Sequence, residues 1–295
     1  MVSVQKKTIE GNVYYYLEHS YREGGAVKKK SRYLGTSVPD DVMEQKQELL
    51  RELYQERWYP LFDEIQERYA DEQTSMPPSL REKKREQFAI EFTYNTDRIE
   101  GSTLTRRETA DLLEKGITPS RRPVEDVKEA EEHREVFYDM LAYDDDLSLQ
   151  TARDWHRRLF RETKEDIAGD IREHPVGISG STYEPPGPEE LDGLLYEFFA
   201  WYQENNETMH PVHLAALVHL KFVTIHPFAD GNGRISRLLM NHVLHRHGYP
   251  MLVIDYQERR SYYNALERSQ VNEEEHMFVE WFFRRYRNEH QRYLD

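Results

Sequence analysis

The chain has 295 residues, of which 38% are hydrophobic and 32% charged, and its formal net charge is −15. This length can bury one or two cores, and 12% aromatic residues argue against a disordered chain. The acidic balance disfavours broad nucleic-acid binding, and the absence of cysteine excludes disulfides, thiolate catalysis and cysteine-ligated zinc.

Residues 1–36 predict a small β-meander, because residues 13–17 and 28–34 favour strands and Gly35 ends the second of them. The basic run at residues 28–32 could contact nucleic acid or form a charged edge strand that resists aggregation. We prefer the edge strand and do not expect nucleic acid as a partner. Residues 1–7 lack the apolar core of a secretion signal, and no membrane span is present, so a cytoplasmic location is expected.

The rest of the chain is predicted to be helical. In the linker region, residues 37–79, Asp40 or Asp41 caps a long helix that reaches Ile65. The following domain, residues 80–295, begins with a helix over about residues 80–100, and Gly101 suits the left-handed stop of that helix. Further helices are expected near residues 105–115, 123–141, 149–160, 189–205, 211–225, 234–247, 257–270 and 274–293.

One segment interrupts this helical pattern. Val176 and Ile178 alternate with small residues, which predicts a short β-hairpin that the prolines after it stop. An interruption of this kind in an all-helical domain suggests a role in function.

The most informative segment is the loop that reads HPFADGNGRISR, from His226 to Arg237. An apolar helical stripe precedes it and another follows. Gly231, Asn232 and Gly233 permit positive φ and close approach, so the N–H groups at the start of the second helix can bind an anion. His226 stands at the end of a rigid helix and can act as a general base near neutral pH.

The charged residues of this loop strengthen the prediction. Arg234 and Arg237 lie three residues apart at a helix start, where positive side chains oppose the helix dipole unless an anion is bound. Asp230 beside phosphates suggests Mg²⁺. The alternative is a capped helix–loop–helix whose arginines pair with surface carboxylates.

The segment resembles the signature of Fic-domain proteins, HxFx(D/E)GNGRxxR, and every defining position matches. Residues 169–180 resemble the flap hairpin of that family, and residues 260–266 resemble the helix that follows its motif. The resemblance covers about residues 80–285. It implies a mainly helical bundle with a short β-hairpin flap.

Fic proteins mostly transfer AMP from ATP to a Ser, Thr or Tyr hydroxyl of a target protein. The resemblance implies that His226 deprotonates this hydroxyl, Asp230 binds Mg²⁺ and Arg237 holds the γ-phosphate. Other residues would cradle the phosphates, namely Gly231, Asn232, Gly233 and Arg234. The flap would dock the target by strand addition through Val176, Gly177, Ile178, Ser179 and Gly180.

A second motif, from Thr96 to Gly101, matches the family's inhibitory sequence (S/T)xxxE(G/N). Thr96 and Glu100 are four residues apart and share a helix face. The resemblance implies that Glu100 forms a salt bridge with Arg237 and blocks the productive pose of the γ-phosphate. Glu100 could also align a water that removes AMP from the target.

Three residues after the motif resemble the nucleotide-base pocket. Tyr262 and Tyr263 match lining positions, although Tyr263 could equally be packed in the core. Gln270 stands where many relatives have an asparagine and could bind an adenine edge.

Three hypotheses remain. The first is an adenylyltransferase that uses Mg²⁺ and ATP, modifies a target or itself, and is held inactive by Glu100. The second is Glu100-dependent removal of AMP, or transfer of another nucleotide. The third is a non-enzymatic, nucleotide-regulated binding module. Regulation in this family also suggests a homodimer.

Overall fold

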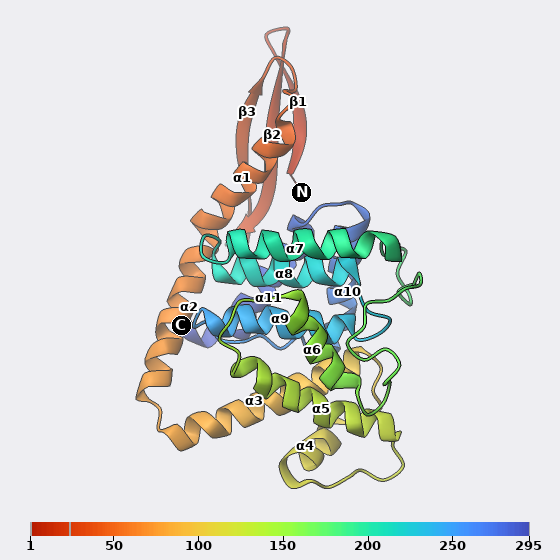
Figure 1. Ribbon diagram of the computed structural model, residues 1–295. Coiled ribbons are helices and arrows are strands. Elements are labelled where there is room, and N and C mark those ends of the chain that lie inside the picture. Colours follow the sequence, from red (N-terminus) through yellow and green to blue (C-terminus); the bar gives the residue numbers. More distant parts are fainter. Residues whose placement is uncertain (1, 24, 295) are drawn as a thin grey trace. The chain divides into compact units, whose positions relative to one another are not determined.

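The computed structural model describes residues 2–23 and 25–294. It divides into two compact units, one that extends to Glu64 and one that begins at Ile65. The protein is mainly helical, and the sheet near its N-terminus is the only one among these residues, which confirms the predicted fold class (Figure 1). None of the described helices is both long and apolar enough to span a bilayer.

The N-terminal unit contains an antiparallel meander of strands β1 (Val2–Ile9), β2 (Asn12–Glu23) and β3 (Ala26–Gly35). A two-residue loop joins the first two strands with φ values of 51° and 83°, as a tight primed turn requires. Helix α1 (Val42–Arg57) packs against β3. On this edge strand, Arg32 pairs with Glu48 at 2.6 Å and with Glu52 at 2.7 Å. The basic run therefore has a structural role within this unit.

The helix predicted to run unbroken to Ile65 is interrupted at Trp58. α1 ends one residue before Trp58, and α2 (Tyr59–Ser75) begins one residue after it. Pro60 accounts for the break, because it has no N–H to donate to the preceding turn and its ring crowds the carbonyl there.

The larger unit carries the helices predicted from residue 80 onward, with small shifts at their ends. They are α3 (Pro78–Ile99), α4 (Arg106–Lys115), α5 (Val124–Leu141), α6 (Leu149–Phe160), α7 (Leu191–Asn205), α8 (Pro211–Ile225), α9 (Asn232–Arg246), α10 (Arg259–Val271) and α11 (His276–Glu289). Three short 3₁₀ turns lie at Pro188–Glu190, Tyr256–Glu258 and Gln291–Tyr293.

The core of this unit is built around α8 and α9. Eleven of the fifteen residues of α8 and twelve of the fifteen in α9 are buried, as expected for helices covered on all sides. α7 and α11 pack against α8, while α3, α5 and α6 pack against α9. Figure 1 shows α7 running alongside α8. The loop between α8 and α9 is therefore anchored at both ends by the most buried helices of the unit.

The predicted β-hairpin around Val176 and Ile178 is wrong. Residues 173–187 form no strand, and the segment contains a turn in which the Ser181 N–H donates to the Ile178 carbonyl at 3.1 Å. Pro175 lies at one end of residues 176–184 and Pro185 and Pro186 lie at the other, and none of these prolines can donate a hydrogen bond to a neighbouring strand. The segment is an extended loop, which we continue to call the flap.

Candidate functional site

The loop between α8 and α9 is held shut by a buried amide. Asn232 is 2% exposed, and its side chain accepts a hydrogen bond from the Phe228 N–H at 2.8 Å and donates to the Phe228 carbonyl at 2.8 Å. The ring of Phe228 is fully buried beneath the loop. The side chain of Asn232 therefore fixes the shape of the loop, and its backbone N–H is one of the donors in the first turn of α9.

His226 has the geometry of a general base. It ends α8 in the left-handed conformation, with φ of 54°. Its Nδ1 lies 3.1 Å from the Val223 carbonyl, and because a carbonyl only accepts, Nδ1 carries the hydrogen and Nε2 keeps a lone pair. Burial lowers the pKa of His226, so the ring is neutral at pH 7 and able to take a proton.

The start of α9 offers unpaired backbone donors. The first bond within the helix runs from the Ile235 N–H to the Gly231 carbonyl at 3.0 Å, so the N–H groups of the three residues between them precede it. Gly231 has a φ of 78°, and a Cβ there would lie 2.4 Å from the ring of Phe160. This turn therefore needs glycine, and it leaves backbone donors at the position where the sequence predicts an anion site.

A carboxylate already occupies the space beside this turn. A Cβ on Gly233 would lie 2.2 Å from Glu100 Oε1 and 3.1 Å from Arg237 Nη1. Glu100 thus rests where any side chain at position 233 would stand. The absence of a side chain there lets an anion contact the first turn of α9.

Arg237 binds this same carboxylate. Its side chain is 1% exposed, and its Nη2 lies 2.5 Å from Glu100 Oε1. Its Nε donates to Thr96 Oγ1 at 3.1 Å, and its Nη1 donates to the Tyr262 hydroxyl at 3.3 Å. Burial acts to lower the pKa of Arg237, but Glu100 outweighs it and raises the pKa, so the guanidinium stays charged.

The end of α3 positions Thr96 and Glu100, the two side chains of the motif that runs from Thr96 to Gly101. Thr96 lies in the last turn of α3, and Glu100 caps the helix directly after Ile99. Gly101 follows with φ of 104°, which turns the chain away from the site. One helical turn separates Thr96 from Glu100, so both reach Arg237.

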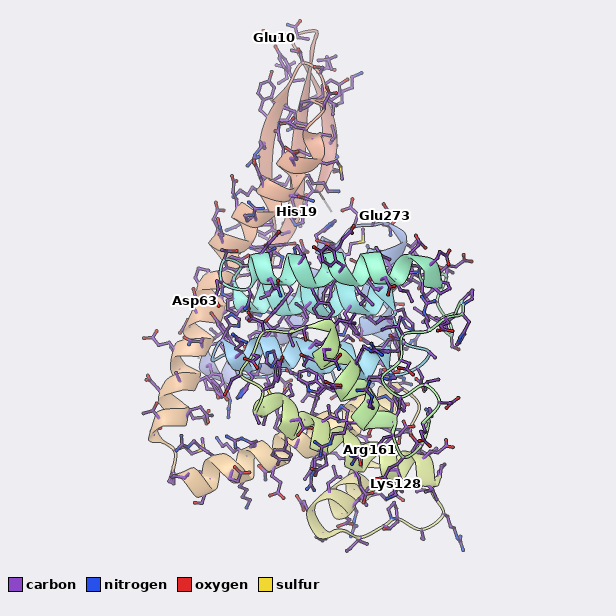
Figure 2. All side chains as sticks on the ribbon, in the orientation of Figure 1. Glu10, His19, Asp63, Lys128, Arg161 and Glu273 are labelled. Atoms are coloured by element: carbon purple, nitrogen blue, oxygen red, sulfur yellow. The ribbon has the colours of Figure 1, made fainter. Side chains whose placement is uncertain are left out.

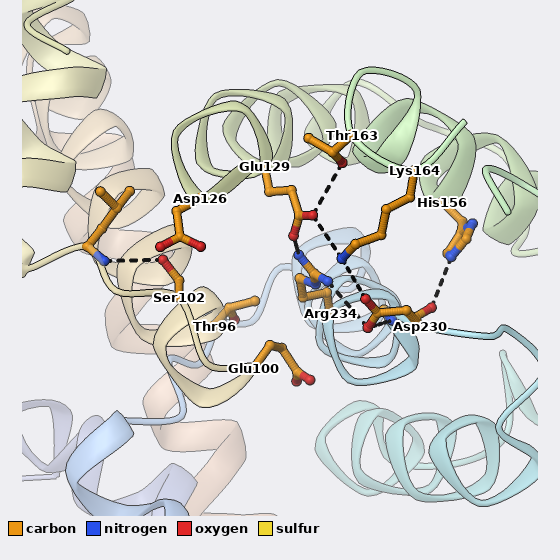
Figure 3. Close-up of polar contacts among 12 residues, drawn as sticks. Thr96, Glu100, Ser102, Asp126, Glu129, His156, Thr163, Lys164, Asp230 and Arg234 are labelled. Carbon is orange, nitrogen blue, oxygen red and sulfur yellow. Dashed lines mark hydrogen bonds and ion pairs between the residues drawn. The ribbon is translucent and has the colours of Figure 1, made fainter. Parts of the chain in front are cut away.

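On the other side of the loop, four charged residues form a network (Figure 3). Arg234 pairs with Glu129 of α5 and lies 3.6 Å from Asp230. Lys164 lies 2.7 Å from Asp230 Oδ2 and 3.0 Å from Glu129 Oε1. Burial acts to raise the pKa of Asp230, but Arg234 and Lys164 outweigh it and lower the pKa, so the carboxylate is ionised.

Asp230 fits the metal ligand that the sequence predicts. It is an ionised oxygen donor, its side chain is 41% exposed, and a cation, the ammonium of Lys164, already lies against it. No group of three or more His, Asp or Glu side chains is arranged to hold a metal ion within the described part of the chain. Mg²⁺ needs no such cage when phosphates and waters supply its other ligands.

Two buried side chains that sequence reasoning missed hold the site in place. The His156 Nε2 lies 3.0 Å from the Asp230 carbonyl, and its ring stacks on Phe228 at 3.8 Å. Arg172, 4% exposed, donates to the carbonyls of His226 at 2.8 Å and Pro186 at 2.6 Å. From the sequence, His156 would be assigned only to the buried face of α6, because no spacing in the sequence links it to Asp230.

Arg172 ties the base of the flap to the catalytic loop. At the far end, the Thr182 N–H and hydroxyl donate to Glu267 of α10 at 2.7 and 2.8 Å. The predicted docking residues lie between these anchors on a partly or fully exposed stretch: Val176, Gly177, Ile178, Ser179 and Gly180.

The three predicted base-pocket residues have distinct surroundings. Tyr262 is 1% exposed, and its hydroxyl lies 3.0 Å from His219 Nε2. Because the same hydroxyl accepts a hydrogen bond from Arg237, Tyr262 helps to fix that guanidinium. Tyr263 is 43% exposed and donates to the carbonyl of Ile99 at 3.0 Å. Gln270 donates to the Thr224 hydroxyl at 3.2 Å, near the end of α8.

Two cavities adjoin the loop. The smaller, about 160 Å³, is lined by Glu100, Lys164, Arg234 and Asp230 together with further acidic residues at the starts of α5 and the end of α3. The larger, about 600 Å³, lies at the base of the flap and meets the loop at Ala229. Two charged residues of the motif, Asp230 and Arg234, therefore line the smaller cavity.

Comparison with known proteins agrees with this geometry. Residues 146–244 match the model of the Fic/DOC family. This segment of the chain is a Fic domain. The match includes the whole loop from His226 to Arg237 and the flap before it.

Among related sequences, "Protein adenylyltransferase Fic" of Drosophila yakuba is 37% identical over 199 residues, which cover 64% of this chain and 38% of that protein. The chain thus spans well under half the length of this relative. The Fic-domain-containing signaling protein of Bacteroides thetaiotaomicron aligns with a TM-score of 0.72 and 27% identity, over 79% of this chain and 95% of that one. Fic-1 of C. elegans, at 24% identity, TM-score 0.71 and coverage of 86% and 75%, shares the fold.

Asn232→Ala is expected to destabilise the Fic domain by about 2–3 kcal/mol, because it leaves the buried N–H and carbonyl of Phe228 without partners. Urea unfolding of the purified chain measures this. Asn272→Ala removes an exposed amide that bonds only within its own helix end and serves as the control. Equal stability of the two variants would show that the loop does not depend on the Asn232 clamp.

Asp97→Asn is expected to stabilise the chain, and more so at higher pH. Burial raises the pKa of Asp97 from 3.8 to about 8, with Arg234 nearby opposing the shift. The unfolded state ionises near pH 4 while the folded state keeps its proton, so stability is lost as pH rises from about 4 to 8. Asparagine carries no such penalty, and the gain is expected to be on the order of 2–4 kcal/mol at pH 8 and smaller at pH 5. Chemical unfolding at both pH values tests this, and a gain independent of pH would contradict it.

Proposed function

We propose that this chain is a protein adenylyltransferase that moves AMP from ATP to a hydroxyl side chain of a target protein, and that Glu100 holds it inactive. One observation carries the proposal: the carboxylate of Glu100 is bonded to Arg237 and rests against Gly233, on the predicted anion site at the start of α9. The names of the related adenylyltransferases support the reaction class.

The reaction needs a base beside a phosphate site, and the loop supplies both. His226 Nε2 accepts the proton of the target hydroxyl, whose oxygen attacks the α-phosphorus of ATP. The bond between the α-phosphorus and the bridging oxygen breaks, and pyrophosphate leaves. The N–H groups at the start of α9 and the guanidinium of Arg234 stabilise the charge that develops on the phosphate oxygens.

Asp230 is the residue that would hold Mg²⁺, which neutralises charge between adjacent phosphates when it is bound. Arg237 is the natural partner for the last phosphate of ATP. Tyr262 and Thr96 hold this arginine in place, so its direction is fixed before a nucleotide arrives.

In this proposal, Glu100 inhibits AMP transfer because its carboxylate occupies Arg237, the partner of the last phosphate of ATP. Arg237 is buried, so it can satisfy one anion in its present position, and a phosphate close to Glu100 would meet a like charge in a site of low dielectric. A nucleotide bound in the presence of Glu100 is therefore expected to place its phosphates out of line for attack.

A second activity is possible at the same carboxylate. Glu100 is 25% exposed on its side chain and stands within the site, so it could orient a water that removes AMP from a modified target. Release of AMP by the wild type that disappears in Glu100→Ala would make removal the main activity.

Glu100→Gly is expected to raise AMP transfer by at least about tenfold, since it frees Arg237 for phosphate. Labelling of the chain itself or of lysate proteins with radiolabelled ATP and Mg²⁺ measures this transfer. Addition of His226→Ala should return the label to background. A Glu100→Gly protein that binds ATP but labels nothing would refute the proposal.

Transfer by Glu100→Gly is also expected to persist below the usual titration range of histidine. Because burial lowers the pKa of His226, the ring stays neutral as pH falls past about 6.5, and the rate drops only when pH passes the lowered pKa. A pH–rate profile with saturating nucleotide measures the midpoint of the acidic limb. Nucleotide affinity across the same range is the control, and a midpoint at or above about 6.5 would argue against His226 as the base.

A further inference from the structure

Lys164 occupies the position at which a cation would meet Asp230. It follows α6 by a few residues, and its ammonium lies 2.7 Å from Asp230 Oδ2 and 3.0 Å from Glu129 Oε1. Figure 3 shows the side chain extending from its own segment to these two carboxylates, which belong to different elements. The proposed reaction assigns no role to this lysine.

The surroundings of the ammonium favour positive charge. The small cavity beside it, about 160 Å³, is lined by six acidic side chains and two cations. The acidic residues are Asp97, Glu100, Glu125, Asp126, Glu129 and Asp230. Asp97, 5% exposed, has no hydrogen-bond partner for either of its side-chain oxygens within the described residues.

The two cations of this cavity differ in their freedom to move. Both cations lie over the ring of Phe160, but the side chain of Arg234 is only 3% exposed and is paired with Glu129. The side chain of Lys164 is 31% exposed and ends in a compact ammonium on a flexible stem. Lys164 is therefore the cation that can leave Asp230 without unpacking the core.

We propose that Lys164 is a tethered counterion that competes with the divalent metal for Asp230, so that the metal enters the site together with the nucleotide phosphates. The inference rests on the proposed function in taking Asp230 as the metal ligand. Without nucleotide, a metal gains Asp230 but must displace the ammonium that is already bonded to it. With nucleotide, the phosphates supply further oxygen ligands for the metal and a new anionic partner for the displaced lysine.

Lys164 is thus a positioning residue, and its effect is on metal affinity. It donates a hydrogen bond to the Asp230 carboxylate while no metal is bound. It also disfavours a metal-loaded enzyme that lacks nucleotide, which makes the order of binding depend on one side chain.

The test measures Mn²⁺ binding to the full chain without nucleotide, through the electron paramagnetic resonance signal of free Mn²⁺ at constant ionic strength. Lys164→Met is expected to tighten binding about tenfold or more, within the range by which outer partners of metal ligands change affinity. Lys164→Arg, which keeps the charge and can bridge the same carboxylates, should stay near the wild type. Lys164→Gln gives a second neutral variant, and thermal unfolding confirms that each variant is folded.

Lys128→Met is the matched control. Lys128, labelled in Figure 2, lies on α5, is 42% exposed and pairs with Glu162 at 3.1 Å, outside the residues that line the cavity. Its removal takes away the same charge and should change Mn²⁺ affinity by less than about twofold. Asp230→Asn in the Lys164→Met background should abolish the tighter binding.

Three results would overturn the proposal. Lys164→Met and Lys164→Gln could bind Mn²⁺ no more tightly than Lys128→Met, or the tighter binding could survive Asp230→Asn. The neutral variants could also weaken binding of Mn²⁺ with a non-hydrolysable ATP analogue while leaving nucleotide-free binding unchanged, which would make Lys164 a phosphate ligand only. Because these measurements need no transfer reaction, an inactive Glu100→Gly protein would refute the proposed function and leave this inference standing.

Discussion

A buried guanidinium needs an anion, and this requirement organises the catalytic side of the domain. Arg237 is almost completely inaccessible to water, and an unpaired charge in such a place costs several kcal/mol. Glu100 provides the counter-charge from the end of α3, and Thr96 and Tyr262 complete the hydrogen bonds of the guanidinium. The end of α3 is therefore held against α9 by an interaction that any competing anion must replace.

The first turn of α9 makes that competition direct. Glycine at position 233 leaves room for a carboxylate against the backbone, and the donors of the first turn attract negative charge. The features that suit the turn to phosphate also suit it to Glu100. In the proposed function, inhibition would therefore use the same chemistry as phosphate binding and would require no separate structure.

The site is neutralised on both sides before a ligand arrives. Glu100 pairs with Arg237 where we propose that a phosphate binds, and Lys164 pairs with Asp230 where we propose that the metal binds. Both groups can leave their partners. The side chain of Glu100 is more exposed than that of Arg237, and Lys164 carries its charge on a flexible stem. A metal–nucleotide complex carries both charges at once, so it can exchange with both groups together, which a free metal or a free anion cannot do.

The sequence by itself determined the helical pattern, the loop from His226 to Arg237 and the motif at Thr96 and Glu100, because these signals depend on local spacing and on glycine. It could not determine that the flap lacks strands, since alternating Val176 and Ile178 followed by prolines is also typical of a short hairpin. Residues from distant segments decided the rest. His156 and Lys164 reach Asp230 across 74 and 66 positions of sequence, and Glu129 reaches Arg234 across 105. Only the packing of α5 and α6 against α9 brings them there. Their roles arise from burial and from charge pairing in three dimensions, which no local pattern records.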